Sequence, residues 1–270
     1  MSRPIRWLIE YVLPPAALFV LVVLVWHVAA RAWQAAYLLP EPLQVWQTAQ
    51  ANAGQLLTAT RVTGEGALAG LGLSLLVGTA VAFVFSQSRL IQRAVYPYAI
   101  FLQTVPIIAI APLVILWCGY GFFSVVVVAF ILSLFPIINN VTAGLTTVDP
   151  NLLELFAIHN ATRMQVLFKL RLPNAVPFLV AGARIACGLS VVGAIVGEIY
   201  AGSRSDAFGL GYLISATSVN LETSYLFAVV FCSTLLGVAI FSSASLIGAT
   251  ILARWHTAAG EPSSRLDKCS

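Results

Sequence analysis

The residues that could do chemistry in this sequence are ionisable groups inside long apolar runs. Arg184 and Glu198 lie in one such run, fourteen residues apart, which is close to four helical turns. On a helix they would share a face but lie about 21 Å apart, too far to pair. A charge buried in lipid is costly, so both are candidates for function. We expect snorkelling for Arg184 and a capping or interface position for Glu198, with substrate contact as the alternative.

Polar side chains in the predicted crossings could line a path across a membrane. The candidates for this substrate path are Gln103, Thr104, Asn139, Asn140, Ser190 and Glu198. Hydrogen bonds between packed helices explain such residues equally well. Nothing in the sequence marks a saturable substrate site.

Motifs for catalysis and for metal binding are absent from the sequence. No GxxxxGK[ST] phosphate loop occurs, and neither of the two lysines, Lys169 and Lys268, follows a glycine-rich turn. The four cysteines form no CxxC pair, and the three histidines do not cluster. We therefore expect no catalytic residue, no metal and no cofactor bound by this chain. The chain cannot hydrolyse ATP alone by the phosphate-loop route.

The composition is that of a membrane protein. Of the 270 residues 60% are hydrophobic and 9% charged, whereas a soluble domain carries roughly a quarter charged residues. One helical crossing needs about 20 apolar residues. We expect an all-α polytopic membrane helical bundle of about six crossings, near residues 13–30, 62–85, 94–117, 123–145, 174–200 and 225–252. Prolines and glycines inside these runs are tolerated where neighbouring helices pack closely.

The first apolar run could instead be a signal peptide. Arg3 and Arg6 precede it, and the triplet Ala30-Arg31-Ala32 resembles a cleavage site. The run is longer than a usual signal core and five more runs follow, so a retained helix is favoured.

The basic residues divide unequally between the two sides that these crossings define. One side holds three of them, namely Arg31, Arg61 and Arg204. The other side holds ten: Arg3, Arg6, Arg89, Arg93, Arg163, Lys169, Arg171, Arg254, Arg265 and Lys268. The positive-inside rule places the second side, with both termini, in the cytoplasm. The basic residues form no stripe with interleaved aromatic residues, so nucleic acid is not an expected partner.

The longest cytoplasmic segment, residues 146–173, is predicted to be structured. Asp149 followed by Pro150 is a strong helix start, because Asp caps the first turn and Pro suits the first helical position. Apolar residues recur at helical spacing on both sides of His159-Asn160, which predicts two short amphipathic helices with a bend. Asn160 suits the bend because asparagine accepts a left-handed backbone. Such helices either lie in the lipid interface or dock in a groove on a partner protein.

This segment resembles the EAA loop of binding-protein-dependent ABC importer permeases. The family pattern is E-A-A, a glycine six residues after the glutamate, and later I-x-L-P. Here Glu154 and Leu172-Pro173 match, while Leu155-Phe156 replace the alanines, Asn160 the glycine and Leu170 the isoleucine. These apolar replacements suggest a bulkier docking surface. The resemblance implies a coupling loop at residues 149–173 that an ATPase grips, with contacts from Glu154, Leu155, Phe156, Ala157, Asn160, Ala161, Leu172 and Pro173.

Three further stretches resemble the nitrate/taurine-type branch of these permeases: residues 103–121 (QTVPIIAIAPLVILWCGYG), 135–150 (FPIINNVTAGLTTVDP) and 209–214 (GLGYLI). That branch imports nitrate, bicarbonate, taurine, sulphonates, pyrimidine vitamin precursors and riboflavin. The resemblance implies a single permease domain over residues 1–270, with the type I ABC importer permease fold, in a bacterial inner membrane. It implies alternating-access uptake of a small solute, with an anion favoured over a vitamin-like heterocycle. The implied partners are ABC ATPase subunits that use ATP and Mg²⁺, a second permease copy in a homodimer, an extracytoplasmic substrate-binding protein and membrane lipid.

The alternative is a self-contained secondary transporter or channel. Such proteins often show two repeated halves, with interrupted helices and intramembrane charges. No repeat relates residues 1–135 to residues 136–270, and few charges lie within the crossings. A structural or lipid-scaffold protein would explain the crossings but not the ordered loop.

Overall fold

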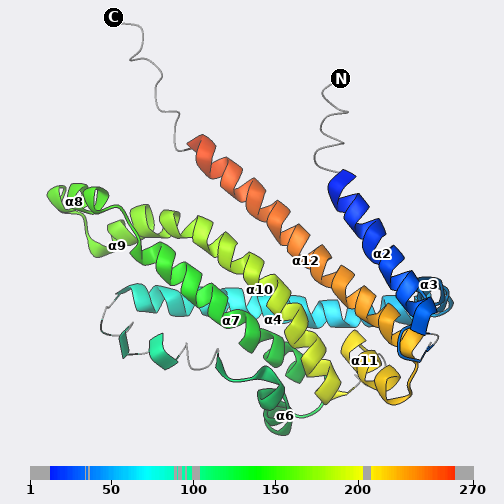
Figure 1. Ribbon diagram of the computed structural model, residues 1–270. Coiled ribbons are helices and arrows are strands. Elements are labelled where there is room, and N and C mark those ends of the chain that lie inside the picture. Colours follow the sequence, from blue (N-terminus) through cyan, green and yellow to red (C-terminus); the bar gives the residue numbers. More distant parts are fainter. Residues whose placement is uncertain are drawn as a thin grey trace, which may run out of the picture.

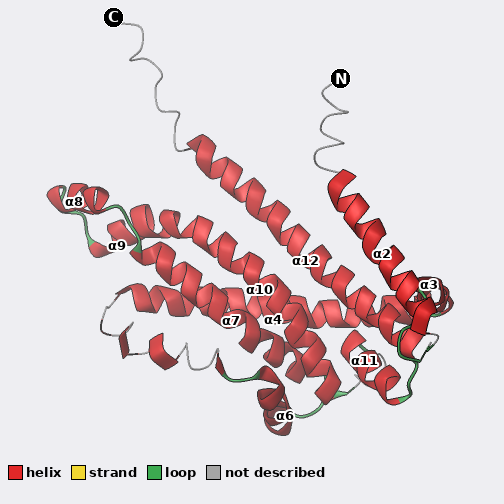
Figure 2. Cartoon of the chain, in the orientation of Figure 1, coloured by secondary structure: helices red, strands yellow, loops and turns green. Residues whose placement is uncertain are grey.

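The computed structural model describes residues 13–33, 35, 37–87, 90, 93–94, 96–98, 104–202 and 208–258. Every regular element in these ranges is a helix (Figure 2). In chain order the elements are α2 (Leu13–Trp33), α3 (Pro42–Ala51), α4 (Ala53–Gln87), α6 (Ile107–Cys118), α7 (Phe122–Thr146), α8 (Pro150–Ile158), α9 (Arg163–Val166), the π-helical turn η2 (Leu167–Arg171), α10 (Leu172–Ala201), α11 (Leu210–Val219) and α12 (Thr223–Ala258).

Five described helical runs are long and apolar enough to cross a membrane. They are α2, α4, α7, the continuous run from α9 through α10, and the stretch 223–253 of α12. Five of the six predicted crossings are thereby confirmed as long helices. The predicted crossing over residues 94–117 is not one continuous helix, because α6 begins at Ile107 after an extended Pro106. Its twelve residues span about 18 Å, less than the roughly 30 Å of the hydrocarbon core.

The centre of the bundle is α7, which packs between α4 and α10. Small residues let these three backbones approach closely. A Cβ atom added to Gly70 of α4 would lie 2.6 Å from Cβ of Ala129, and one added to Gly193 of α10 would lie 2.6 Å from Cα of Ala129. Ala129 itself is fully buried. Glycines of α4 and α10 therefore both pack closely against one alanine of α7.

Two buried serines join α4 to α7 through hydrogen bonds. Ser74 Oγ donates to the carbonyl oxygen of Phe130 at 2.9 Å, and it lies 2.7 Å from Ser133 Oγ. Both serines are fully buried. In lipid a hydroxyl without a partner is costly, so this pair favours one register between the two helices.

The short elements gather at the two ends of the bundle. Figure 1 shows α8 and α9 at the end where α7 finishes and α10 begins. At the opposite end, α3 and α11 pack against α12, and the first halves of α4 and α12 lie there too. The chain thus presents two different surfaces, one built from α8 and α9 and the other from α3 and α11.

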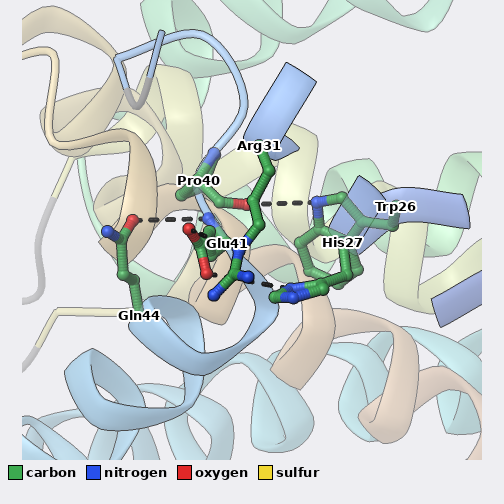
Figure 3. Close-up of polar contacts among 6 residues, drawn as sticks. All are labelled: Trp26, His27, Arg31, Pro40, Glu41 and Gln44. Atoms are coloured by element: carbon green, nitrogen blue, oxygen red, sulfur yellow. Dashed lines mark hydrogen bonds and ion pairs between the residues drawn. The ribbon is translucent and has the colours of Figure 1, made fainter. Parts of the chain in front are cut away.

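The first crossing, α2, lies at the edge of the bundle, and polar contacts hold its end in place. Trp26 Nε1 donates to the carbonyl oxygen of Pro40 at 3.1 Å. Arg31 Nε and His27 Nδ1 lie 3.5 Å and 3.7 Å from the Glu41 carboxylate, which precedes α3 (Figure 3). Ala30 is the one buried residue in α2. Most of α2 is therefore available to lipid or to another subunit.

Candidate functional site

Helix α8 begins as the sequence predicts and has no buried residue. The Asp149 side chain accepts a hydrogen bond from the backbone N–H of Asn151 at 2.9 Å, and Pro150 takes the first helical position. Leu152, Leu155 and Ile158 of α8 are 42%, 48% and 77% exposed. A capped helix that leaves its apolar side chains uncovered is suited to bind a groove on the surface of a partner protein.

The bend after α8 is confirmed at Asn160. This residue has a φ of 50°, in the left-handed region that asparagine tolerates better than most residues. The backbone N–H of Ala161 donates to the carbonyl oxygen of Phe156 at 3.0 Å. This bond closes the end of α8 with the hydrogen-bond pattern of a Schellman motif, so the chain leaves the helix in a fixed direction.

The second predicted helix exists but is not a separate element. Thr162 and Gln165 form a capping box at the start of α9, with distances of 2.7 Å and 3.3 Å. From Arg163 the helix runs without a break through η2 into α10. Pro173 lacks an N–H group, and in an α-helix its ring would crowd the carbonyl oxygen four residues earlier. The π-helical turn just before Pro173 relieves this crowding.

The structure brings part of the predicted coupling set together. Leu155, Phe156 and Ala161 border one groove of about 350 Å³, together with His159, Gln165 and Lys169. Glu154 and Ala157 are exposed on α8, and Asn160 is exposed at the bend. Leu172 and Pro173 are half-buried at the start of α10, where Leu172 packs against the hydrophobic core. The L-P pair therefore anchors the segment to the bundle, while the α8 residues face outward.

The predicted path residues that the structure describes mostly make hydrogen bonds of their own within the bundle. Asn139 Oδ1 accepts from the Tyr96 hydroxyl at 2.6 Å, and Asn140 Nδ2 donates to the carbonyl oxygen of Pro136 at 2.8 Å. Ser190 is fully buried and donates to the carbonyl oxygen of Cys187 at 2.9 Å. Thr104 is exposed, whereas Gln103 lies outside the described residues. Asn139, Asn140, Ser190 and Thr104 do not border the four described pockets of about 350 to 770 Å³.

Glu198 caps a helix, as the sequence predicts, and joins three elements. Its side chain is 3% exposed, and Oε2 accepts from Thr63 Oγ1 of α4 and from the backbone N–H of Gly211, both at 2.8 Å. Thr63 Oγ1 in turn accepts from the backbone N–H of Leu210 at 2.8 Å. Two of the free N–H groups at the start of α11 are thus satisfied by side chains of α4 and α10. We call Thr63, Glu198 and residues 209–211 the Glu198 clamp.

Two glycines make the clamp possible. A Cβ atom on Gly209 would lie 2.1 Å from Glu198 Oε1, and one on Gly211 would lie 2.2 Å from the carbonyl oxygen of Ile195. Neither position has room for a side chain. The Gly-Leu-Gly stretch carries part of the family resemblance, but nothing in the sequence indicates its contact with Glu198. Glu198 and Thr63 are 135 residues apart, and no local pattern connects them.

The expectation of snorkelling for Arg184 is wrong. Its guanidinium packs against α12, where Nη2 lies 3.4 Å from the carbonyl oxygen of Ser245 as a hydrogen-bond donor. Arg184 Nε is buried and has no hydrogen-bond partner among the described residues. Helix α12 packs beside α10, and the Arg184 side chain contacts it.

Comparison with known proteins places this architecture in a family. The model of the family described as "Binding-protein-dependent transport system inner membrane component" matches residues 70–255. The formylaminopyrimidine transport permease protein ThiX of Halalkalibacterium halodurans is 34% identical over 232 residues, covering 86% of this chain and 91% of that protein. The riboflavin transport system permease protein RibX of Chloroflexus aurantiacus is 31% identical over 225 residues, covering 82% and 81%. The putative aliphatic sulfonates transport permease protein SsuC of Escherichia coli is 28% identical over 263 residues, covering 96% and 97%.

A solved structure supports the fold. A chain of the inward-facing MetNI methionine ABC transporter superposes with a TM-score of 0.64 at 19% identity, covering 74% of this chain and 97% of that chain. At this identity the likeness shows the fold alone. Because the family model matches well over half of the sequence, the chain belongs to the inner-membrane components of binding-protein-dependent ABC transport systems.

Proposed function

We propose that this permease imports a small solute by coupling ATP hydrolysis in a partner subunit to a movement of α10, with α8 as the contact. ATP hydrolysis belongs to the partner in this family. The observation that carries the proposal is the geometry of α8: both ends are capped, none of its residues is buried, and α9 joins it to a crossing without a break. A push on α8 would therefore reach α10 through a short, ordered connection.

The docking surface on the proposed ATPase side consists of the apolar residues of α8 and the groove beside them. Leu152, Leu155 and Ile158 are uncovered, and Phe156 and Ala161 border the groove. We propose that Glu154 lies at the edge of this contact, where a charge can pair with the partner without being buried. Ala157, Asn160 and the Leu172-Pro173 pair complete the coupling loop of residues 149–173, within one permease domain of residues 1–270.

We propose an orientation with both termini in the cytoplasm. The basic residues described on the α8 side include Arg93, Arg163, Lys169 and Arg171. The side formed by α3 and α11 would then face outward and receive a substrate-binding protein. A pocket of about 770 Å³ lies on that side, bordered by residues of α3, α4, α11 and α12. We further propose that a second copy completes the transport unit as a homodimer.

The substrate class that we propose is a small polar heterocycle of the vitamin-precursor type. Two relatives that are more than 30% identical over at least four fifths of this chain are named for formylaminopyrimidine and riboflavin. The outer pocket supports this class, since Tyr37, Tyr212 and Tyr225 border it together with Asn52 and Gln55. Aromatic rings with nearby amides suit a planar ring that carries hydrogen-bonding groups.

A small anion is the second candidate, and Arg184 is the observation that favours it. Its Nε is buried without a hydrogen-bond partner in the described part of the chain. Relatives named for aliphatic sulfonates, taurine and bicarbonate are 26–32% identical. For either class we propose that Asn139 and Asn140, with Gln103 and Thr104, border the path. The bonds of Ser190 and Glu198 favour packing roles for these two residues.

Reconstitution into liposomes tests the proposed function. The permease is combined with its ATPase subunits and binding protein, and uptake of labelled formylaminopyrimidine and taurine is measured with and without ATP. We expect ATP-dependent uptake that Glu154→Arg abolishes, while the variant still inserts into the membrane. Equal uptake by the permease alone would overturn the proposal and restore the alternative of a self-contained transporter.

A further inference from the structure

A basic pocket of about 660 Å³ lies at the α8 end of the bundle. Arg93, Arg163 and Arg171 border it, and Ser86 and Thr146 add polar groups. No carboxylate is found among its described lining residues. Three guanidinium groups around one cavity repel one another unless an anion lies between them. The pocket therefore has the charge of an anion site.

The arginines of this pocket come from separate segments of the chain. Arg171 ends η2, and its Nη1 donates to the carbonyl oxygen of Ser86 at 3.0 Å, near the end of α4. Arg163 begins α9, and Arg93 lies in the segment after α4. Thr146 is the last residue of α7. The bond to Ser86 uses one nitrogen of Arg171, so other N–H groups of this guanidinium stay available for an anion.

Guanidinium groups bind phosphate through paired hydrogen bonds, because their planar fork matches two phosphate oxygens. Arg171 directly precedes the first residue of α10, and Thr146 ends α7. The pocket therefore lies near the ends of α4 and α7 and the start of α10, which we expect at the depth of lipid headgroups. Met164 and Phe168, on the same segment as Arg163 and Arg171, are 59% and 56% exposed. Exposed apolar side chains beside a basic pocket suit a lipid better than a free ion.

We propose that this pocket binds a phosphate group, carried by the headgroup of an anionic phospholipid in the cytoplasmic leaflet. The phosphate would bridge Arg93, beyond α4, to Arg163 and Arg171 on the segment that joins α8 to α10. The lipid would thereby hold the proposed coupling segment against the ends of α4 and α7. This site depends on the orientation proposed above but not on the identity of the transported solute.

Lipid retention tests the site directly. The full-length chain, with its ATPase subunits, is placed in nanodiscs of phosphatidylcholine with or without phosphatidylglycerol, and retained lipid is counted by native mass spectrometry. We expect preferential retention of phosphatidylglycerol, reduced about tenfold in Arg171→Gln and in Arg163→Gln. Lys169→Gln is the matched control, because it removes the same charge from the same segment but borders the neighbouring groove. It should retain the lipid within about twofold of the unaltered chain.

Three results would overturn the proposal. The first is equal retention of both lipids, and the second is an equal loss in Lys169→Gln, which would indicate a general effect of charge. The third result comes from an arm in which inorganic phosphate is added to nanodiscs that contain only phosphatidylcholine. Protection against thermal unfolding equal to that given by phosphatidylglycerol would show that free phosphate is the ligand. None of these readouts measures uptake, so they are independent of the test of the proposed function.

Discussion

Single residues show how this chain places charge inside a membrane. Glu198 is almost fully buried, yet one carboxylate oxygen accepts two hydrogen bonds from different elements. Its role is to cap α11 and to hold it against α4. Arg184 lies in the same crossing, bonds a carbonyl of α12 and leaves one nitrogen without a described partner. Each of these residues has one buried side-chain atom without a described hydrogen-bond partner, Arg184 Nε and Glu198 Oε1. The two bonds of Glu198 Oε2 favour packing, whereas Arg184 stays a candidate for substrate contact.

Replacing Glu198 by alanine should destabilise the end of the bundle where α11 lies. The Thr63 hydroxyl and the Gly211 N–H would both lose their acceptor, and a buried unsatisfied group costs about 1–3 kcal/mol. We expect a lower unfolding temperature in detergent. Glu65→Ala is the control, because it removes an exposed ion pair with Arg61 that is worth under about 1 kcal/mol. Equal unfolding temperatures for the two variants would contradict the clamp.

At the scale of helices, close packing at small residues decides how α4, α7 and α10 fit. Gly193→Ala should destabilise the bundle strongly, because the new Cβ would lie 2.6 Å from Cα of Ala129, a backbone atom that cannot move aside. Overpacking of this kind costs about 1–3 kcal/mol or more. The measurement is the fraction of protein that stays monodisperse after heating in detergent.

Gly188→Ala provides the comparison within the same helix. No atom lies within 4 Å of a Cβ added at Gly188. Alanine there should leave stability unchanged or raise it slightly, since glycine is a poor helix former. If Gly193→Ala and Gly188→Ala are equally stable to heating in detergent, the result contradicts the close approach of α7 and α10.

The sequence predicted those elements that depend on neighbouring residues. Five crossings follow from long apolar runs, and the start and bend of α8 follow from Asp149-Pro150 and Asn160, whose effects are local. Hydropathy does not reveal the break at Pro106 within the third apolar run, because it averages over neighbouring residues. The π-helical turn over residues 167–171 has no local sequence signal beyond Pro173, which lacks an N–H group. The Glu198 clamp and the basic pocket could not be predicted, since both combine segments far apart in the chain.

For the molecule as a whole, the proposed orientation predicts which end reacts from outside the cell. Single cysteines replace Ile158 of α8 and Leu221 after α11, which are 77% and 79% exposed. In intact cells without an outer membrane, a membrane-impermeant maleimide should label Leu221→Cys at once and Ile158→Cys only after lysis. The exposed Cys118, and Cys269 near the C-terminus, are first changed to serine to remove background labelling. The reverse pattern would place α8 outside and exclude contact with an ATPase.

Cross-linking from α8 shows most directly whether this helix is the contact with the ATPase. The Ile158→Cys variant is assembled with its ATPase subunits and treated with a short heterobifunctional reagent that reacts with cysteine and then with nearby groups. We predict a covalent product of permease and ATPase from Ile158→Cys and none from Leu221→Cys at the opposite end. A product from neither position, in a complex that still hydrolyses ATP and imports its solute, would contradict the role of α8.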